Sequence, residues 1–392
     1  MREFTTESVR KIQKSGIRVI FDLASTMDDV VSLCVGEPDI ITPEHIRKVA
    51  AQTILDGKTK YTSNSGMLEL RQELSKYQER RFGVYYDPDD QIICTVGAAE
   101  GIDDAIRTMI EPGDEVIVVE PSFVCYKPSI EFQHGVAIPV ETKAENGFRL
   151  TPEQLEAAIT PKTKALVLPY PGNPTGAIME KEDLKKLVPI IIKHDLMVIS
   201  DEVYAELTFG GRKHTTIASL PGMYERTIIV SGFSKSFSMT GWRLGYVMGP
   251  KFFMHQLLKV HANNTSCAST TSQYAGIEAL CNPAQCKEDL QNMREVYEKR
   301  RTYLLGELER IGLPCHEPQG AFYAFPSIKH TGLTSEEFCT RLLMEEHCAV
   351  VPGSAFGDSG EGFIRISYAY SKEEIAQAIE KIEHFLKKLE AK

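Results

Sequence analysis

The sequence predicts an α/β fold with a large, mainly parallel sheet and a second, smaller α+β domain. Six short apolar runs follow one another between residues 91 and 234, and helical stretches separate several of them. This alternation is typical of a doubly wound domain, in which helices cover both faces of a parallel sheet. A chain of 392 residues also exceeds the size at which a single hydrophobic core stops growing. We therefore expect two domains.

The chain before the sheet is expected to be mostly helical. A short amphipathic helix at the N-terminus precedes a loop at residues 15–17, and a helix is expected from Pro43 to about Asp56. A loop rich in Gly, Ser and Asn after Tyr61 then opens a second amphipathic helix. Residues 1–42 are assigned to an N-terminal arm and part of the small domain.

A seventh apolar run, residues 244–250, is expected to break the parallel pattern. It follows the preceding strand after a connection shorter than the dozen or so residues that a parallel crossover needs. We predict that this strand runs antiparallel, which gives a seven-stranded sheet in a large domain, residues 43–290. A long charged helix from about residue 293 and a smaller alternation of strands and helices form a C-terminal domain, residues 291–392.

Composition argues against several classes of protein. The formal net charge of -10 disfavours nucleic acid as a partner. No apolar run is long enough to span a membrane, and the N-terminus lacks a signal core, so we expect a cytoplasmic protein without a membrane partner. The nine cysteines are scattered without a CxxC pair, which favours reduced thiols over a disulfide framework or a zinc site. No metal site is expected.

Residues that follow the predicted strands carry the chemistry, because ligands of open α/β sheets bind outside the carboxyl ends of the strands. The first strand leads into Ala98 and Ala99 at the start of a helix, where backbone N–H groups can bind an anion. Phe123 follows the second strand and offers a ring that can stack on a planar group. Taken singly, a plain strand-to-helix turn and a core aromatic explain these residues at least as well.

Two later strands end in polar groups. Asn173 lies in a rigid turn, and Asp201 follows a buried apolar run with Tyr204 three residues further on. A buried acid needs a cationic or hydrogen-bonding partner. A turn residue and a helix N-cap are the alternative interpretations of Asn173 and Asp201.

Lys235 follows the last parallel strand, eight residues before Arg243. Lysine acts as a Schiff-base nucleophile when burial or a second cation lowers its pKa, and arginine binds phosphate through two parallel bonds. Both residue types are also common as solvated surface charges. Together, the strand ends offer an anion site, a ring, an amide, an acid with a phenol, and an amine with an arginine, which suits one anionic cofactor.

Three motifs give a specific resemblance: NPTG at 173–176, DEVY at 201–204, and SK followed by TGWRLGY. They resemble the fold type I aminotransferases that use pyridoxal 5'-phosphate, and more narrowly the class I aspartate and aromatic aminotransferase group. The resemblance extends from VGEPD near the start to GFIRISYA near the end. It implies transfer of an amino group from an L-amino acid, aspartate, aromatic or similar, to a 2-oxo acid such as 2-oxoglutarate.

The resemblance also implies a role for each residue at the cofactor. Lys235 holds pyridoxal phosphate as an imine and later moves a proton from the substrate Cα, and Asp201 pairs with the pyridine nitrogen. Tyr204 and Asn173 bond the phenolic oxygen, and Phe123 stacks on the ring. The implied phosphate-binding residues are Ala98, Ala99, Ser234, Arg243 and, from the neighbouring subunit of a homodimer, Tyr61.

On the substrate side, the resemblance assigns the α-carboxylate to Arg365 in GFIRISYA, with Asn173 beside it, and a close backbone approach to Gly36 in VGEPD. Closure over the substrate is expected of the family, and the turn from Ser15 to Arg18 is a candidate for it.

Substrate identity stays open. The segment NNTSCASTTSQ lacks the arginine that one aspartate-specific subgroup carries there, and Arg18 and Arg107 are candidate substitutes. The segments NNTSCAS and LPYPGNPTG also resemble enzymes that act on N-acetyl-diaminopimelate. A pyridoxal-phosphate-dependent carbon–sulfur β-lyase of the same fold is the alternative enzyme. A regulatory module is a third class, but we expect no DNA-binding segment before VGEPD.

Overall fold

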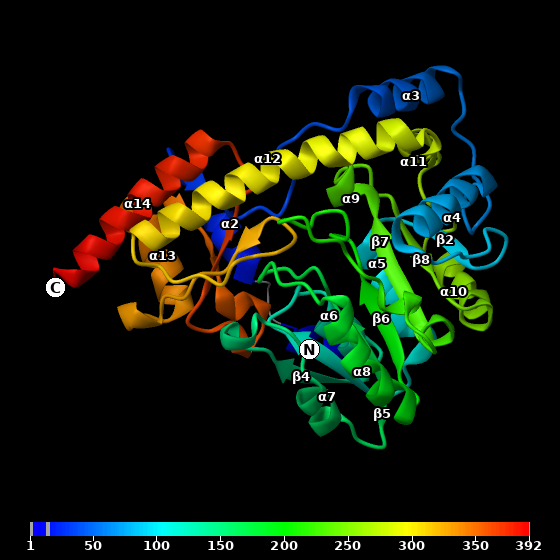
Figure 1. The fold of residues 1–392 in the computed structure, drawn as a ribbon, viewed down its shortest axis with the longest axis horizontal. Helices are drawn as coiled ribbons and strands as arrows, with labels where there is room; N and C mark the ends of the chain where they lie inside the picture. Colours follow the sequence, from blue (N-terminus) through cyan, green and yellow to red (C-terminus); the bar gives the residue numbers. More distant parts are fainter. Residues whose placement is uncertain (1–2, 13–15, 392) are drawn as a thin grey trace.

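The computed structural model describes residues 3–12 and 16–391, with a large sheet between helices and a smaller C-terminal part beside it (Figure 1). The large sheet has seven strands, as predicted, and their order is β2-β8-β7-β6-β5-β3-β4. In that order the strands are β2 Ile92–Thr95, β8 Gly245–Met248, β7 Thr227–Gly232, β6 Met197–Asp201, β5 Thr163–Leu168, β3 Glu115–Glu120 and β4 Val136–Glu141.

Strand β8 runs against all the others in this sheet. It pairs antiparallel with both β2 and β7, whereas the remaining pairs are parallel. The connection from β7 holds only the short helix α9, Phe233–Ser236, and a turn, so it cannot make a parallel crossover. The prediction of one antiparallel strand is confirmed. Lys235 and Arg243 both lie in this tight connection.

Helices cover both faces of the large sheet because successive strand residues point to opposite sides. Val116 and Val118 of β3 pack with the helices on one face, and Ile117 and Val119 belong to the core on the other. The helices of the first face are α5 Ala98–Met109, α6 Tyr126–Phe132 and α10 Lys251–Asn264. Those of the second are α4 Leu68–Phe82, α7 Pro152–Ala158, α8 Lys181–Lys193 and α11 Thr270–Cys281.

The C-terminal part is built on a three-stranded antiparallel sheet in the order β11-β12-β9. A second, two-stranded sheet pairs β1 of the N-terminal arm in parallel with β10. The elements of this part are β1 Val31–Ser32, β9 Tyr323–Ala324, α13 Ser335–Glu346, β10 Cys348–Ala349, β11 Val351–Pro352, β12 Ile364–Ser367 and α14 Lys372–Glu390.

Helix α12, Pro283–Arg310, runs along both parts and contacts α11 and α14 (Figure 1). The expectation that it begins near residue 293 is wrong. The side chain of Asn282 accepts hydrogen bonds from the backbone N–H groups of Ala284 and Gln285, and Pro283 occupies the first turn. These are two strong signals for a helix start. The expected domain boundary, between residues 290 and 291, falls within this helix.

The N-terminal arm holds two helices, α1 Glu7–Lys11 and α2 Gly16–Ala24. The predicted loop is therefore wrong for residues 16 and 17, which begin α2, while Ser15 lies outside the described residues. Helix α3, Glu44–Leu55, matches its predicted range. None of the helices within residues 3–12 and 16–391 combines the length and apolar character that a membrane crossing requires.

Candidate functional site

The carboxyl ends of the large sheet and the edge of the C-terminal sheet enclose a cavity of about 280 Å³. All residues predicted to bind the cofactor or the substrate's α-carboxylate, other than Tyr61, line it: Gly36, Ala98, Ala99, Phe123, Asn173, Asp201, Tyr204, Ser234, Lys235, Arg243 and Arg365. Tyr61 lies in the loop between α3 and α4 and is 90% exposed. It does not line the cavity of its own chain.

Lys235 reaches the cavity from α9, directly after β7. Its Nζ donates a hydrogen bond of 2.6 Å to the carbonyl of Gly36. Burial lowers the pKa of Lys235 to about 8, and the positive charges of Arg365 and Arg243 act in the same direction, while Glu37 opposes them. A lowered pKa increases the share of neutral amine at neutral pH, which is the form that attacks a carbonyl carbon.

Asp201, at the end of β6, is buried without a recorded ion pair among the described residues. Its Oδ2 accepts a hydrogen bond of 2.7 Å from the hydroxyl of Tyr126, and its Oδ1 accepts one of 3.2 Å from the N–H of Val203. Burial raises the pKa of Asp201, and the two hydrogen bonds oppose that rise. A buried carboxylate is stable in its ionised form when it faces a cation. The protonated ring nitrogen of a bound cofactor fits this requirement.

Arg365, on β12, is only 2% exposed and is held rigidly. Its Nη1 donates to Asn173 Oδ1 at 3.0 Å, and its Nη2 donates to the carbonyl of Cys34. The rings of Tyr323 and Phe356 lie 4.5 and 4.9 Å from its Cζ. Its Nε has no hydrogen-bond partner in the described structure. A fixed guanidinium with a spare donor suits a ligand carboxylate.

Two phenols meet beside Arg365. The hydroxyls of Tyr204 and Tyr323 lie 2.8 Å apart, and either can donate the hydrogen bond. Burial raises the pKa of both tyrosines, and the charge of Arg365 opposes that rise. A side chain at Gly36 would collide with the hydroxyl of Tyr323, which explains the glycine in the VGEPD segment.

The opposite end of the cavity is suited to an anion. Ala98 and Ala99 form the first turn of α5, where N–H groups lack intrahelical partners and the helix dipole is positive. Arg243 lies against Gly97, at which a Cβ would collide with the guanidinium, and Gly97 has a φ of 82°. Ser234 adds a hydroxyl from α9. These donors match a phosphate group.

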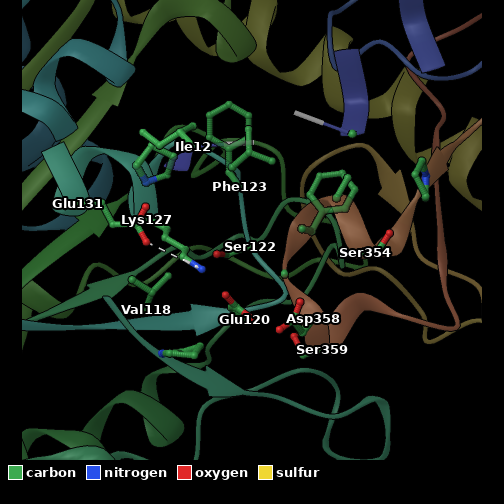
Figure 2. Close-up of a pocket in the computed structure, with 18 of the residues that line it drawn as sticks. Ile12, Val118, Glu120, Ser122, Phe123, Lys127, Glu131, Ser354, Asp358 and Ser359 are labelled. Carbon is green, nitrogen blue, oxygen red and sulfur yellow. Dashed lines mark ion pairs between the residues drawn. The ribbon is translucent and has the colours of Figure 1, made fainter. Parts of the chain in front are cut away.

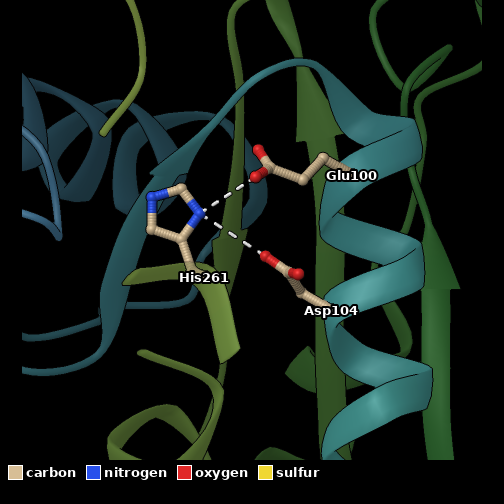
Figure 3. Close-up of side chains that lie close together, drawn as sticks. All are labelled: Glu100, Asp104 and His261. Carbon is tan, nitrogen blue, oxygen red and sulfur yellow. Dashed lines mark ion pairs between the residues drawn. The ribbon is translucent and has the colours of Figure 1, made fainter. Parts of the chain in front are cut away.

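An ion-pair network anchors this first turn of α5 (Figure 3). His261, on α10, places its Nδ1 at 3.2 Å from Glu100 Oε1 and 3.4 Å from Asp104 Oδ2. Burial lowers the pKa of His261, but the two carboxylates outweigh burial and raise it to about 9. Glu100 Oε2 also accepts from the N–H of Val96 at the end of β2. The network therefore fixes the turn that presents Ala98 and Ala99.

Phe123 also lines a second, larger cavity of about 1460 Å³. Figure 2 shows Phe123 together with Glu120 at the end of β3 and with Asp358 and Ser359 of the C-terminal part. Among the residues that the structure describes, six carboxylates and two lysines line this larger cavity: Glu7, Glu120, Glu131, Glu141, Glu336 and Asp358, with Lys11 and Lys127.

Of the two arginines considered for a substrate side chain, Arg107 does not line the cavity. Arg107 is exposed on α5 and forms an ion pair with Asp103 at 2.6 Å. The side chain of Arg18 lies outside the described structure. Conversely, sequence reasoning missed Tyr126 and Tyr323. The only sequence signals were their positions, three residues after Phe123 and within the GAFYAF strand.

Comparisons with known proteins agree with this geometry. The family model described as aminotransferase class I and II matches residues 28–382. YugH of Bacillus subtilis strain 168 is 46% identical over 388 residues, covering 99% of this chain and 100% of that protein. An aspartate aminotransferase of Pyrococcus abyssi is 43% identical over 376 residues, covering 96% of each. The solved aromatic aminotransferase of Pyrococcus horikoshii OT3 has a TM-score of 0.90 at 41% identity, covering 94% of this chain and 99% of that one.

Proposed function

The chain belongs to the class I and II aminotransferases, and we propose that Lys235 is the residue that binds its cofactor covalently. Members of this family use pyridoxal 5'-phosphate, and this chain is an aminotransferase that moves an amino group from an amino acid to a 2-oxo acid. One observation carries the assignment of Lys235. Its amine, with a pKa lowered to about 8, shares a cavity with the buried carboxylate of Asp201, for which the described residues provide no cation.

The remaining cofactor contacts follow from the positions of the lining residues. We propose that Asp201 holds the ring nitrogen in its protonated form and that Tyr204 and Asn173 bond the phenolic oxygen. Phe123 covers the ring. Phosphate-binding groups are the N–H groups of Ala98 and Ala99, the hydroxyl of Ser234 and the guanidinium of Arg243. Pyridoxal phosphate, when bound, supplies an electron sink for the negative charge left at the substrate Cα.

The protein's own groups then orient the substrate and move its proton. Arg365 binds the α-carboxylate, with Asn173 fixing the guanidinium from one side. This contact directs the Cα–H bond towards Lys235, whose Nζ removes the Cα proton and later returns a proton to the product. A base with a pKa of about 8 suits this task near neutral pH.

We propose a cytoplasmic homodimer in which Tyr61 serves the phosphate site of the partner, with residues 43–290 as the cofactor domain. The 90% exposure of Tyr61 supports this, because an aromatic side chain so exposed in one chain is available to another. Subunit mixing tests it. Lys235→Ala and Tyr61→Ala chains, each weakly active alone, should regain activity in hybrid dimers, where one site has both residues. Without such recovery, Tyr61 does not act across subunits.

We further propose that the amino donor has a neutral, aromatic side chain. Within the described part of the chain, three cations line the cavity, Lys235, Arg243 and Arg365, and all have other tasks. The excess of carboxylates among the described residues that line the neighbouring larger cavity disfavours a second acidic group in the donor. The curated relatives include an aspartate enzyme, so this proposal rests on the cavity and not on similarity.

A panel of donors tests the proposed substrate class. Phenylalanine, tyrosine, alanine, aspartate and N-acetyl-diaminopimelate are each assayed with 2-oxoglutarate and with pyruvate. We expect the highest kcat/KM with an aromatic donor. A preference for aspartate would contradict the proposal. Release of a 2-oxo acid from cystathionine without an acceptor would instead indicate β-lyase activity.

A further inference from the structure

Tyr323 lies between the substrate end and the cofactor end of the site. Its hydroxyl is 2.8 Å from that of Tyr204, and its ring centroid is 4.5 Å from Cζ of Arg365. The side chain is only 1% exposed. Its strand, β9, pairs with β12, which carries Arg365, so the sheet register fixes the two residues relative to each other.

We propose that Tyr323 is a positioning residue that couples carboxylate binding at Arg365 to the hydrogen bond between Tyr204 and the cofactor's phenolic oxygen. The inference rests on the proposed function of this cavity. Arg365 also donates to Asn173, which is proposed to bond the same phenolic oxygen. The pair of tyrosines is then a second connection between Arg365 and that oxygen.

The direction of the hydrogen bonds follows from proton counting. A tyrosine hydroxyl has a single proton to donate. When Tyr204 donates that proton to the cofactor oxygen, its own oxygen is left to accept, and Tyr323 is the hydroxyl recorded next to it among the described residues. A chain from Tyr323 to Tyr204 to the cofactor oxygen strengthens the last bond, because each donor polarises the next.

The charge of Arg365 makes this chain sensitive to the substrate. Burial raises the pKa of Tyr204 and Tyr323, and Arg365 opposes the rise for both. A bound carboxylate neutralises the guanidinium, so the phenols become weaker acids and weaker donors. The anionic phenolic oxygen is then stabilised less, and the pKa of the lysine-bound chromophore rises. Substrate binding thereby favours the protonated form of the chromophore.

Absorbance titrations of the holoenzyme with pH test the coupling. The probes are 3-phenylpropanoate and maleate, carboxylates without an amino group. In the wild type, a saturating probe should raise the chromophore pKa. In Tyr323→Phe, the pKa without probe should already be higher by about half a unit or more, the scale of one lost hydrogen bond. The rise caused by the probe should fall to less than half of the wild-type value.

Two further variants separate this coupling from a general structural effect. Tyr368→Phe is the matched control, because Tyr368 is a buried tyrosine that bonds the Ala321 carbonyl at 3.3 Å and does not line the cavity. Its chromophore pKa and the shift caused by the probe should equal those of the wild type. In Tyr204→Phe, the probe should raise the chromophore pKa less than in the wild type. The double variant with Tyr323→Phe should show the same reduced rise.

The outcomes are distinct. If the probe raises the chromophore pKa of Tyr323→Phe or of Tyr204→Phe as much as that of the wild type, the proposed role of Tyr323 is wrong. Tyr204→Phe provides this test even if Tyr323→Phe does not fold. If the wild-type protein forms no chromophore with pyridoxal phosphate, the proposed function fails instead.

Discussion

Two clusters with buried carboxylates lie near the cavity, and they differ in how their charge is balanced. Glu100 and Asp104 face His261, a cation supplied by the protein itself. Asp201 receives two hydrogen bonds from neutral donors and has no recorded ion pair among the described residues. The first cluster is complete within the folded chain, whereas the second needs a cation from a ligand.

This difference separates stability from function. Removing one partner from a balanced buried ion pair leaves an unpaired charge and destabilises the fold. Removing the charge of an unbalanced carboxylate relieves a desolvation cost, so the apoprotein does not lose stability, but the cofactor loses its partner. Neutralising a carboxylate of the first cluster should therefore reduce stability more than activity, and neutralising Asp201 should reduce activity and not stability.

The largest effect on activity is expected from Asp201→Asn. The ring nitrogen loses its anionic partner, so kcat/KM should fall by at least about 100-fold, a scale typical of losing one fixed electrostatic contact in an active site. The melting temperature of the apoprotein should not decrease. Steady-state kinetics and thermal unfolding measure the two effects.

Asp104→Asn is the matched control for this substitution. It should lower the melting temperature and reduce kcat/KM of the folded enzyme much less than Asp201→Asn does, because Asp104 does not line the cavity. Similar losses of activity in both variants would remove the distinction between the clusters.

The next largest effect is expected on stability from His261→Asn. The buried carboxylate of Asp104 and the partly buried one of Glu100 then lose their cation, and the free energy of unfolding should fall by about 3 kcal/mol. Urea denaturation at pH 6.5 measures this loss. An unchanged free energy of unfolding would show that the network is not balanced by an imidazolium.

The stability of the wild type should also depend on pH through His261. Its pKa in the folded protein, about 9, is above the unfolded value, so the contribution is full below about pH 6.5 and disappears as pH rises through about 9. The difference in unfolding free energy between wild type and His261→Asn should shrink accordingly between pH 6.5 and 9.5. A difference that stays constant over this range would contradict the assignment.

The smallest effect is expected from Tyr126→Phe, which removes one hydrogen bond from Asp201 and keeps its charge. A loss of about 1 kcal/mol in transition-state stabilisation corresponds to roughly a fivefold lower kcat/KM. A decrease as large as that of Asp201→Asn would mean that Tyr126, and not the carboxylate charge, provides the main interaction.

The architecture of the large sheet follows from local sequence features. Apolar runs mark its strands, and the short connection between Gly232 and Gly245 predicts the antiparallel strand. The start of α12 was also readable from Asn282 and Pro283, but the charged pattern further along the helix outweighed these signals. Helix α2 has no comparable signal at its start, where Gly16 and the preceding serine favour a loop.

Side chains at strand ends were predictable because parallel strands bring their carboxyl ends to one edge. Tyr126 and Tyr323 were not, since each meets its partner across a long sequence separation: Tyr126 bonds Asp201, and Tyr323 bonds Tyr204. Neither hydrophobic periodicity nor turn chemistry reports such contacts. His261 was missed for the same reason, because α10 and α5 meet only in the folded protein.

The most direct test of the central claim is to locate the covalent attachment of the cofactor. The protein is loaded with pyridoxal phosphate, reduced with sodium borohydride, digested and mapped by mass spectrometry. The account predicts a single stable modification, on Lys235, that is absent from Lys235→Ala. Modification of another lysine in the wild type, or none, would contradict the account.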